Sequence, residues 1–282
     1  MKFRLTDHRF LRLILNTYKR YEGDSGGYLA AAITYYAFLS LYPLLLVHLF
    51  VLGWLFAGDT VRQAAWEGRL FAFIPGIQTL LAHNLMALIH ARGTIGVIGF
   101  AGLIWTGLGM AHAASWSLAQ IFRVTIRPGF FRRTASSLGA LAVLSMLILI
   151  SIGLSGVIGG TASIGMQGVV LKIIGILVTL FLDSLIFLMA YWNLAPTRQL
   201  SLHHLWKGAV LGGSGWTIVR ISSVWYFAIV VNRWSVVHGT FAAALAVLVV
   251  LYFGSWLFLY GAELNAVLHE EKGIVSNKRS VS

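Results

Sequence analysis

The sequence predicts an all-α membrane protein that crosses the bilayer six times, and three observations lead to this prediction. Of the 282 residues, 58% are hydrophobic and only 11% are charged, whereas about a quarter of the residues in soluble domains are charged. Six apolar stretches are long enough to cross about 30 Å of hydrocarbon, which takes roughly 20 helical residues. Runs such as residues 243–250 are apolar on every face, which favours helices over barrel strands with alternating faces.

The predicted spans lie at about residues 29–56, 94–121, 138–159, 169–192, 208–231 and 240–267. This six-helix domain, residues 29–267, follows a basic N-terminal arm over residues 1–28 and precedes a tail over residues 268–282. The connection over residues 57–93 is long and carries apolar residues at helical spacing. We therefore expect two short helices in this first external loop.

Lys and Arg are unevenly distributed between the predicted connections. Fifteen of them lie in the N-terminal arm, the second-to-third and fourth-to-fifth connections and the C-terminal tail, and five lie on the opposite side. Basic residues accumulate on the cytoplasmic side of membrane proteins, so both termini are predicted to be cytoplasmic. The net charge of +12 is then explained mostly by topology, and nucleic acid is not an expected partner.

The N-terminal arm mixes apolar and basic residues between His8 and Tyr21. As an amphipathic helix it could lie on the inner leaflet of the membrane, attracted by anionic lipid. A solvated basic arm is the alternative interpretation.

Two ionisable residues lie deep within predicted spans. Asp183 lies about nine residues, and Arg220 about twelve, from the cytoplasmic ends of the fourth and fifth spans. At 1.5 Å per residue their depths are roughly 14 and 18 Å, within one helical turn of each other. Each charge costs several kcal/mol in the membrane unless it is paired or hydrated. They could form a structural ion pair, face water separately, or contact and gate a substrate.

Glu263 lies near the cytoplasmic end of the last span. One interpretation is an interfacial cap that pairs with Arg198 or Lys207. The other is a cytoplasmic gate or a lock between helices.

Tyr36, Ser40 and Pro43 follow one another at helical spacing and form one stripe along the first span. Pro43 cannot donate a hydrogen bond to the carbonyl of Leu39, so a kink is expected there. A polar stripe with a kink suits a helix that lines a hydrated path, and contact between helices is the alternative.

Catalytic and metal-binding motifs are not found in the sequence. The chain has no Cys, and its nine His residues do not follow the spacing of a zinc site. There is no phosphate-binding Gly-Lys-Ser/Thr loop and no Gly-x-Ser-x-Gly nucleophile motif. The sequence predicts neither an enzyme nor a bound metal or cofactor.

Four segments resemble sequence signatures of the YihY/BrkB family of bacterial inner-membrane proteins, and they occur in the same order as in that family. The opening signature corresponds to residues 30–46 and the closing signature to residues 260–266, while residues 127–133 and 206–213 match between them. The resemblance runs in order from about residue 21 to residue 270. It implies a six-helix inner-membrane bundle, in a family that resembles transporters and has been linked to envelope lipid or polysaccharide handling. An old ribonuclease label also belongs to this family.

The fifth span departs from the family pattern. Many members carry an acidic residue close before a basic one, whereas this chain keeps Arg220 and has Thr217 in place of the acid. A mechanism in which this helix carries its own ion pair is therefore not expected.

Two functions follow as hypotheses. The first is a transporter or flippase-like exporter of an amphiphilic anionic envelope molecule, whose substrate path or gate involves residues in three regions: Asp183 with Arg220, Glu263, and the stripe Tyr36, Ser40 and Pro43. The second is a non-transporting membrane scaffold or envelope-assembly factor. Membrane lipid, including anionic lipid or an envelope precursor, is the expected partner, and self-association into a homo-oligomer stays open.

Overall fold

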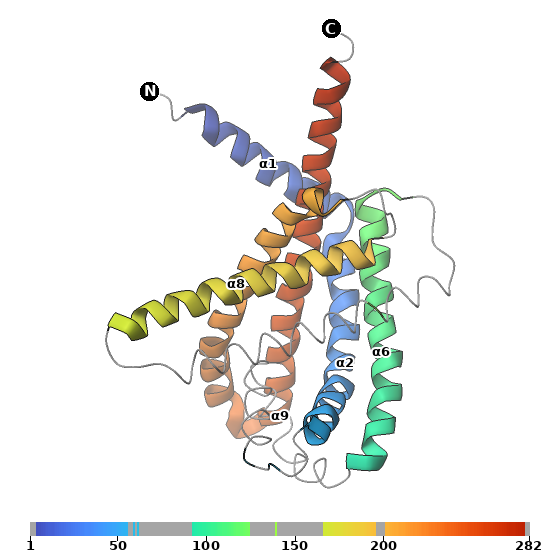
Figure 1. Ribbon diagram of the computed structural model, residues 1–282, viewed down its shortest axis with the longest axis vertical. Helices are drawn as coiled ribbons and strands as arrows, with labels where there is room; N and C mark the ends of the chain where they lie inside the picture. Colours follow the sequence, from blue (N-terminus) through green and yellow to red (C-terminus); the bar gives the residue numbers. More distant parts are fainter. Residues whose placement is uncertain are drawn as a thin grey trace.

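The computed structural model describes residues 4–55, 92–124, 166–195 and 201–279, together with Asp59, Val61 and Gly139. Five helices lie within these residues: α1 (Arg4–Gly23), α2 (Gly26–Leu55), α6 (Arg92–Ile121), α8 (Met166–Leu194) and α9 (Leu202–Arg279) (Figure 1). No strand occurs in this part of the chain, so the all-α prediction is confirmed there. The predicted span 138–159 and the short helices of the first loop fall almost entirely outside the described residues.

A two-residue turn joins α1 to α2. The amide of Asp24 donates to the carbonyl of Arg20 at 2.9 Å, and Ser25 adopts a left-handed conformation with a φ of 58°. Gly26 then opens α2 directly beneath the Tyr21 ring, where any Cβ would overlap that ring. As a result α1 leaves the helix bundle at an angle (Figure 1), and we call this end of the bundle the α1 end.

The predicted N-terminal arm is helical, because α1 covers most of it. Large apolar side chains are exposed on α1, with Leu11 57% and Tyr18 51% accessible, and the basic residues Arg12 and Lys19 are exposed as well. This composition is that of an interfacial helix. Its contact with the inner leaflet stays a prediction.

Helix α9 folds back on itself. Its 78 residues would extend about 117 Å if the helix were straight, yet Asn265 contacts residues near the start of α9. Its Oδ1 accepts from the amide of Gly208 at 2.8 Å and its Nδ2 donates to the carbonyl of Leu205 at 2.9 Å. Figure 1 shows the two halves running side by side. We call residues 202–226 the first arm and residues 244–279 the second arm; they include most of the predicted fifth and sixth spans, residues 208–231 and 240–267.

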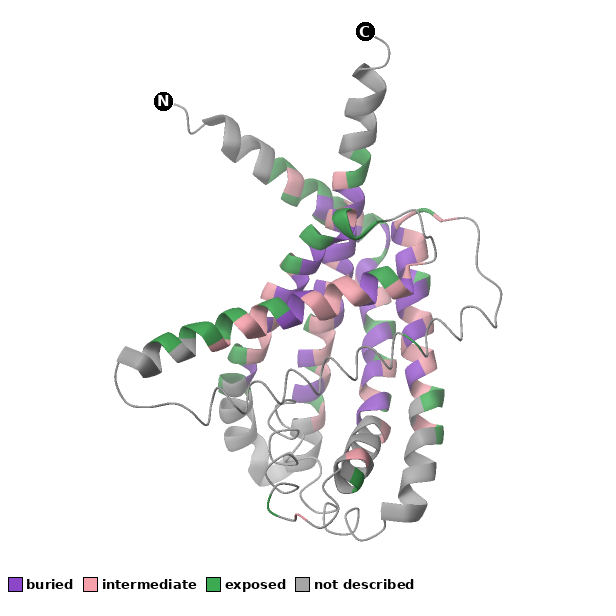
Figure 2. Ribbon diagram, in the orientation of Figure 1, coloured by how far each residue is buried: buried purple, intermediate pink, exposed green. Residues whose placement is uncertain are grey.

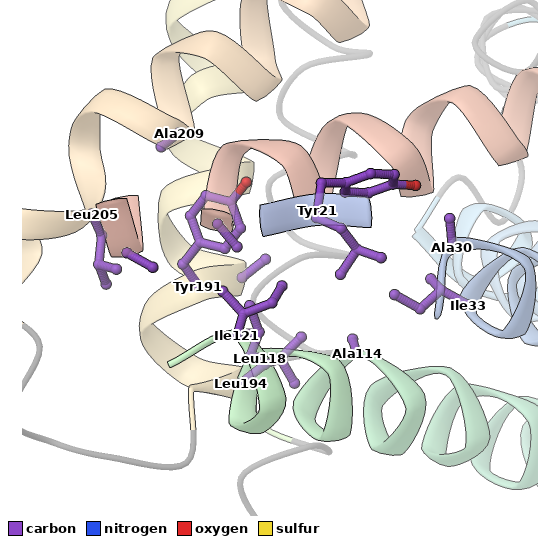
Figure 3. Packing of buried hydrophobic residues seen from close by; sticks show 14 of the residues in the cluster. Tyr21, Ala30, Ile33, Ala114, Leu118, Ile121, Tyr191, Leu194, Leu205 and Ala209 are labelled. Carbon is purple, nitrogen blue, oxygen red and sulfur yellow. The ribbon is translucent and has the colours of Figure 1, made fainter. Parts of the chain in front are cut away.

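The hydrophobic core lies at the α1 end, where all five helices converge (Figures 2 and 3). Small side chains such as Ala30, Ala114 and Ala209 let the helices approach closely. Tyr191 of α8 is fully buried among them, and its hydroxyl donates to the carbonyl of Phe258 in the second arm at 2.7 Å. The core therefore fixes α8 between the other elements.

The outer surface is strongly apolar. On α8, Ile173, Leu177 and Phe181 are between 52% and 65% accessible, and Figure 2 shows this exposed face along the outer part of the helix. Large exposed apolar patches are unfavourable in water and suit contact with lipid. In the described residues two helices, Ile173–Leu194 and Ala244–Glu270, are long and apolar enough to cross a membrane. The count of six spans stays a prediction.

Close packing of α8 against the first arm leads to a testable prediction. A Cβ added to Gly213 would lie 2.5 Å from the backbone of Ser184, so Gly213→Ala must push the helices apart. We expect it to lower the free energy of unfolding by about 1–3 kcal/mol, measured by thermal unfolding in detergent followed by circular dichroism.

Gly23→Ala is the matched control, because no atom lies within 4 Å of a Cβ at that position. It should leave the unfolding temperature unchanged or slightly raised. Equal stability of the two variants would contradict the observed contact.

Candidate functional site

Asp183 and Arg220 form an ion pair between α8 and the first arm of α9. Nη2 of Arg220 lies 3.2 Å from Oδ2 of Asp183, and the two side chains are 18% and 1% accessible. The helices run antiparallel here, since Ser184 packs against Gly213 and Phe187 packs against Gly212. The two residues that the sequence placed at similar depth are therefore in contact.

Thr217 completes this cluster. Its hydroxyl oxygen lies 2.7 Å from Oδ2 of Asp183 and 3.0 Å from the carbonyl oxygen of Gly213. The single hydroxyl hydrogen is therefore shared between these two acceptors. Thr217 stands where related sequences are expected to carry the acid. In this protein the neighbouring helix supplies the acid, and Thr217 helps to hold it in place.

The cluster of Asp183, Thr217 and Arg220 lies deep in the bundle. Asp183 is eleven residues before the end of α8 at Leu194, which corresponds to about 16 Å along the helix. Its Oδ1 is buried and has no hydrogen-bond partner among the described residues. An arginine guanidinium binds carboxylate and phosphate groups in a planar, directional manner, so this position suits recognition of an anionic group.

A second ionic cluster lies at the α1 end, around Glu263 of the second arm. Nε of Arg20 lies 2.9 Å from Oε2 of Glu263, whose side chain is 1% accessible. The same guanidinium lies 2.5 Å from Oε1 of Glu270 and donates to the carbonyl of Ile121 at 2.7 Å. Arg20 thus ties α1 to α6 and to the second arm.

The cation beside Glu263 differs from the two that the sequence analysis named. Lys207 instead places its ammonium group 5.8 Å from the centre of the Trp206 ring, and Arg198 lies outside the described residues. The reason is that the C-terminal end of α1 meets the second arm and brings Arg20 to Glu263. The observed contacts are those of a lock between helices.

Asp24 also belongs to the cluster at the α1 end. Its Oδ1 lies 2.8 Å from Nη2 of Arg123, and the two side chains are 5% and 61% accessible. Its backbone carbonyl accepts from Nε2 of Gln120 at 2.9 Å. Sequence reasoning missed both Arg20 and Asp24, because their partners Glu263 and Arg123 are far away in the sequence.

The environment of α1 shifts two ionisation equilibria. Burial disfavours the charged form of Arg20, but its hydrogen bond to Glu270 and the charge of Glu263 outweigh this and raise its pKa. Burial raises the pKa of Tyr21 well above its usual range. Arg20 is therefore a permanent cation at the α1 end, and Tyr21 is neutral.

The stripe on α2 faces α6. The Tyr36 ring covers Gly109, and the Pro43 ring covers Gly102, where an added Cβ would lie 3.2 Å from its Cγ. Ser40 is buried and donates to the carbonyl of Ala37 at 2.8 Å. Figure 1 shows the C-terminal part of α2 running in a different direction, as a proline within the helix predicts. These contacts are those of helix packing, and a role in a hydrated path stays a prediction.

The described histidines do not gather around a metal site. The rings of His204 and His269 are 5.2 Å apart, and Nδ1 of His204 lies 2.8 Å from Oγ of Ser201. In the part of the chain that the structure describes, no group of three or more His, Cys, Asp or Glu residues could hold a metal ion. His83 and His90 lie outside it.

Comparisons with known proteins place this architecture in a family. YfkH of Bacillus subtilis, which is named as ribonuclease-like, is 26% identical over 93% of this chain and 96% of its own length. The inner membrane protein YhjD of Escherichia coli is 21% identical over 88% of this chain and 78% of its own. A UPF0761 membrane protein of Albidiferax ferrireducens is 24% identical over 89% of this chain and 60% of its own length. No solved structure matches the chain.

The family model for virulence factor BrkB matches residues 17–281. This range includes both ionic clusters, the last residues of α1 and the whole of α2, α6, α8 and α9. The protein therefore belongs to the BrkB family of membrane proteins.

Proposed function

We propose that the protein is a multi-pass protein of the bacterial inner membrane, with both termini in the cytoplasm, that transports an amphiphilic anionic envelope molecule. The observation that carries this proposal is the buried cluster that Asp183, within the apolar segment Ile173–Leu194, forms with Thr217 and Arg220 of the first arm. The inner-membrane name of one relative supports the location.

The cluster is poorly explained by stability alone. Removing two charges from water costs several kcal/mol per ion, and well-packed hydrophobic residues often replace a buried ion pair without loss of stability. Ionisable residues at membrane depth commonly mark substrate or ion pathways. The presence of a charged residue, Asp183, in an apolar segment and its pairing with Arg220 therefore support a functional role.

The geometry suits a substrate with an anionic headgroup and an apolar tail. Arg220 is partly accessible, and its neighbours Ile218 and Ile221 are 64% and 55% accessible. A headgroup could therefore reach Arg220 from the side of the bundle while its tail stays against the apolar outer surface. There the anion replaces Asp183 as the partner of the guanidinium, and protonation of Asp183 keeps the charge of the cluster balanced.

The first prediction concerns bound lipid. Mass spectrometry of the purified protein should find one anionic lipid class enriched over the bulk membrane. Arg220→Ala should reduce this enrichment about tenfold or more, because a hydrogen-bonded charge contact contributes about 1.5–3 kcal/mol. Arg220→Lys, which keeps the charge but not the planar geometry, should retain part of it.

Arg12→Ala is the control, because Arg12 is exposed on α1 and far along the chain from the cluster. It should leave the enriched class unchanged. Bulk-like lipid in the wild type, or equal loss in both alanine variants, would count against a headgroup site at Arg220 and in favour of the scaffold function, which a search for bound partner proteins would then pursue.

The second prediction concerns proton coupling. In reconstituted vesicles, a pH gradient should drive the movement of a fluorescent phosphatidylglycerol analogue by the wild type. Asp183→Asn should abolish this movement, because a side-chain amide does not bind and release a proton in this pH range. The variant should still fold, since Asn is isosteric and can keep the contact with Thr217.

Thr217→Val serves as the matched control, because it removes a hydrogen bond to Asp183 but leaves the titratable group. It should slow transport without abolishing its dependence on the gradient. Full transport by Asp183→Asn would show that the cycle does not use this carboxyl group.

A further inference from the structure

Helix α1 has a buried side and an apolar side that point in different directions. Thr17 and Tyr21 are buried against the bundle. Leu11, Leu15 and Tyr18 also follow one another at helical spacing, and all three are exposed. At 3.6 residues per turn, these exposed side chains are turned by roughly 100° from the buried pair. We call Leu11, Leu15 and Tyr18 the apolar sector of α1.

A basic sector borders the apolar sector on the side away from the bundle. Arg12 and Lys19 are seven residues apart, so they lie above one another on the helix, and both are exposed. The apolar sector ends before Glu22, which is exposed in the last turn of α1. An apolar sector flanked by Lys and Arg is the arrangement of a helix that lies in the plane of a membrane interface.

Contacts at the C-terminal end of α1 determine which sector faces outward. Arg20 binds Glu263 and Glu270 of the second arm. The Tyr21 ring packs edge-on against Trp256, with the ring centres 6.2 Å apart. Because these contacts hold one side of α1 against the bundle, the apolar sector is directed away from the core.

Exposed tryptophans mark the level at which α1 leaves the bundle. Trp116, Trp192 and Trp206 are exposed on three different helices. They lie five residues before the end of α6, two residues before the end of α8 and four residues after the start of α9. These helix ends meet Tyr21 of α1 in the core at the α1 end (Figure 3). Tryptophan is enriched where a membrane meets water, so this level corresponds to the membrane interface.

The charges at this level favour an anionic surface. The exposed basic residues of the α1 end are Arg12, Lys19, Arg123 and Lys207. Glu22 and Glu270 are the exposed acidic residues in the described part of this end. Each Lys or Arg near an anionic membrane strengthens binding to it about fivefold. The excess of basic residues therefore complements anionic lipid headgroups.

We propose that α1 is a docking surface for an anionic lipid bilayer. The apolar sector inserts at the boundary between headgroups and acyl chains, and Arg12 and Lys19 bind lipid phosphates. Arg20 acts as a positioning residue, because it holds the end of α1 to the second arm. This inference is independent of the proposed transport.

The lipids at α1 differ from a lipid bound at Arg220. They belong to the bilayer surface, exchange freely with it and are replaced by detergent during purification. Arg12→Ala therefore stays a valid control for lipid that copurifies through Arg220.

Spin-label accessibility tests the docking, because the chain contains no Cys and a single label can be introduced. The full-length protein with Leu15→Cys is labelled and reconstituted in vesicles of equal parts phosphatidylcholine and phosphatidylglycerol. The label should be accessible to oxygen, which dissolves in acyl chains, and protected from a water-soluble nickel chelate. A label at Asn16→Cys, exposed outside the apolar sector, should show the reverse.

The charge dependence is tested with the same label at Leu15→Cys. Arg12→Gln combined with Lys19→Gln should reduce the equilibrium constant between lipid-contacting and water-exposed α1 about 25-fold, because two contacts of about fivefold each are lost. Vesicles of phosphatidylcholine alone should shift the label in the same direction. Arg220→Ala should leave the label unchanged, so the failure of this proposal and the failure of the transport proposal are distinguishable.

Three outcomes would overturn the proposal. Equal access of the nickel chelate to the labels at Leu15→Cys and Asn16→Cys would show a solvated arm. Protection from both reagents, in detergent as well as in vesicles, would show that protein covers the apolar sector. Protection that is the same with and without phosphatidylglycerol would show that anionic lipid is not required. A second label at Leu11→Cys keeps the test intact if Leu15→Cys does not fold.

Discussion

The amide of Asn265 joins the two arms of α9, and the arrangement at the α1 end depends on this contact. Its oxygen and nitrogen bind the backbone of Gly208 and Leu205, and the absence of side chains at Gly208 and Gly261 lets the backbones meet. Glu263 lies two residues before Asn265, so the same contact fixes it within the core. A buried amide whose donor and acceptor are both satisfied holds the two arms in one register relative to each other. This register sets the position of Glu263 relative to α1.

The two ionic clusters differ in their charge balance. At Asp183 one buried carboxylate faces one guanidinium and a hydroxyl donor, so an incoming anion leaves the net charge unchanged only if Asp183 takes up a proton as the anion binds. At the α1 end three carboxyl groups, those of Asp24, Glu263 and Glu270, contact two guanidinium groups, those of Arg20 and Arg123. The exposed side chains of Arg123 and Glu270 place the second cluster in contact with solvent, which screens its charges.

Much of the fold was predictable from the sequence, because apolar runs of helical length require helices in a membrane. The depth of Asp183 and Arg220 could be obtained by counting residues, and this was enough to suggest contact. The partner of Glu263 could not be obtained in this way. It depends on the turn before α2, where the left-handed conformation of Ser25 sets the direction of α1, and on a contact between residues 243 positions apart. Counting residues within a span gives the depth of a side chain in the membrane. It does not give the direction of α1, which lies outside the predicted spans.

The stripe on α2 shows that a polar pattern can also belong to the packing of two helices. Tyr36 and Pro43 are seven residues apart and cover Gly109 and Gly102, which are also seven residues apart on α6. Rings placed over glycines fill the space between helices, and Ser40 satisfies its hydroxyl within its own helix. The contact of α8 with the first arm differs, because there the buried groups are charged and Ile218 and Ile221 beside Arg220 are exposed. In the proposed function a headgroup would therefore reach Arg220 between α8 and α9. The contacts of α2 with α6 are those of helix packing, and a role of the stripe in a hydrated path stays a prediction.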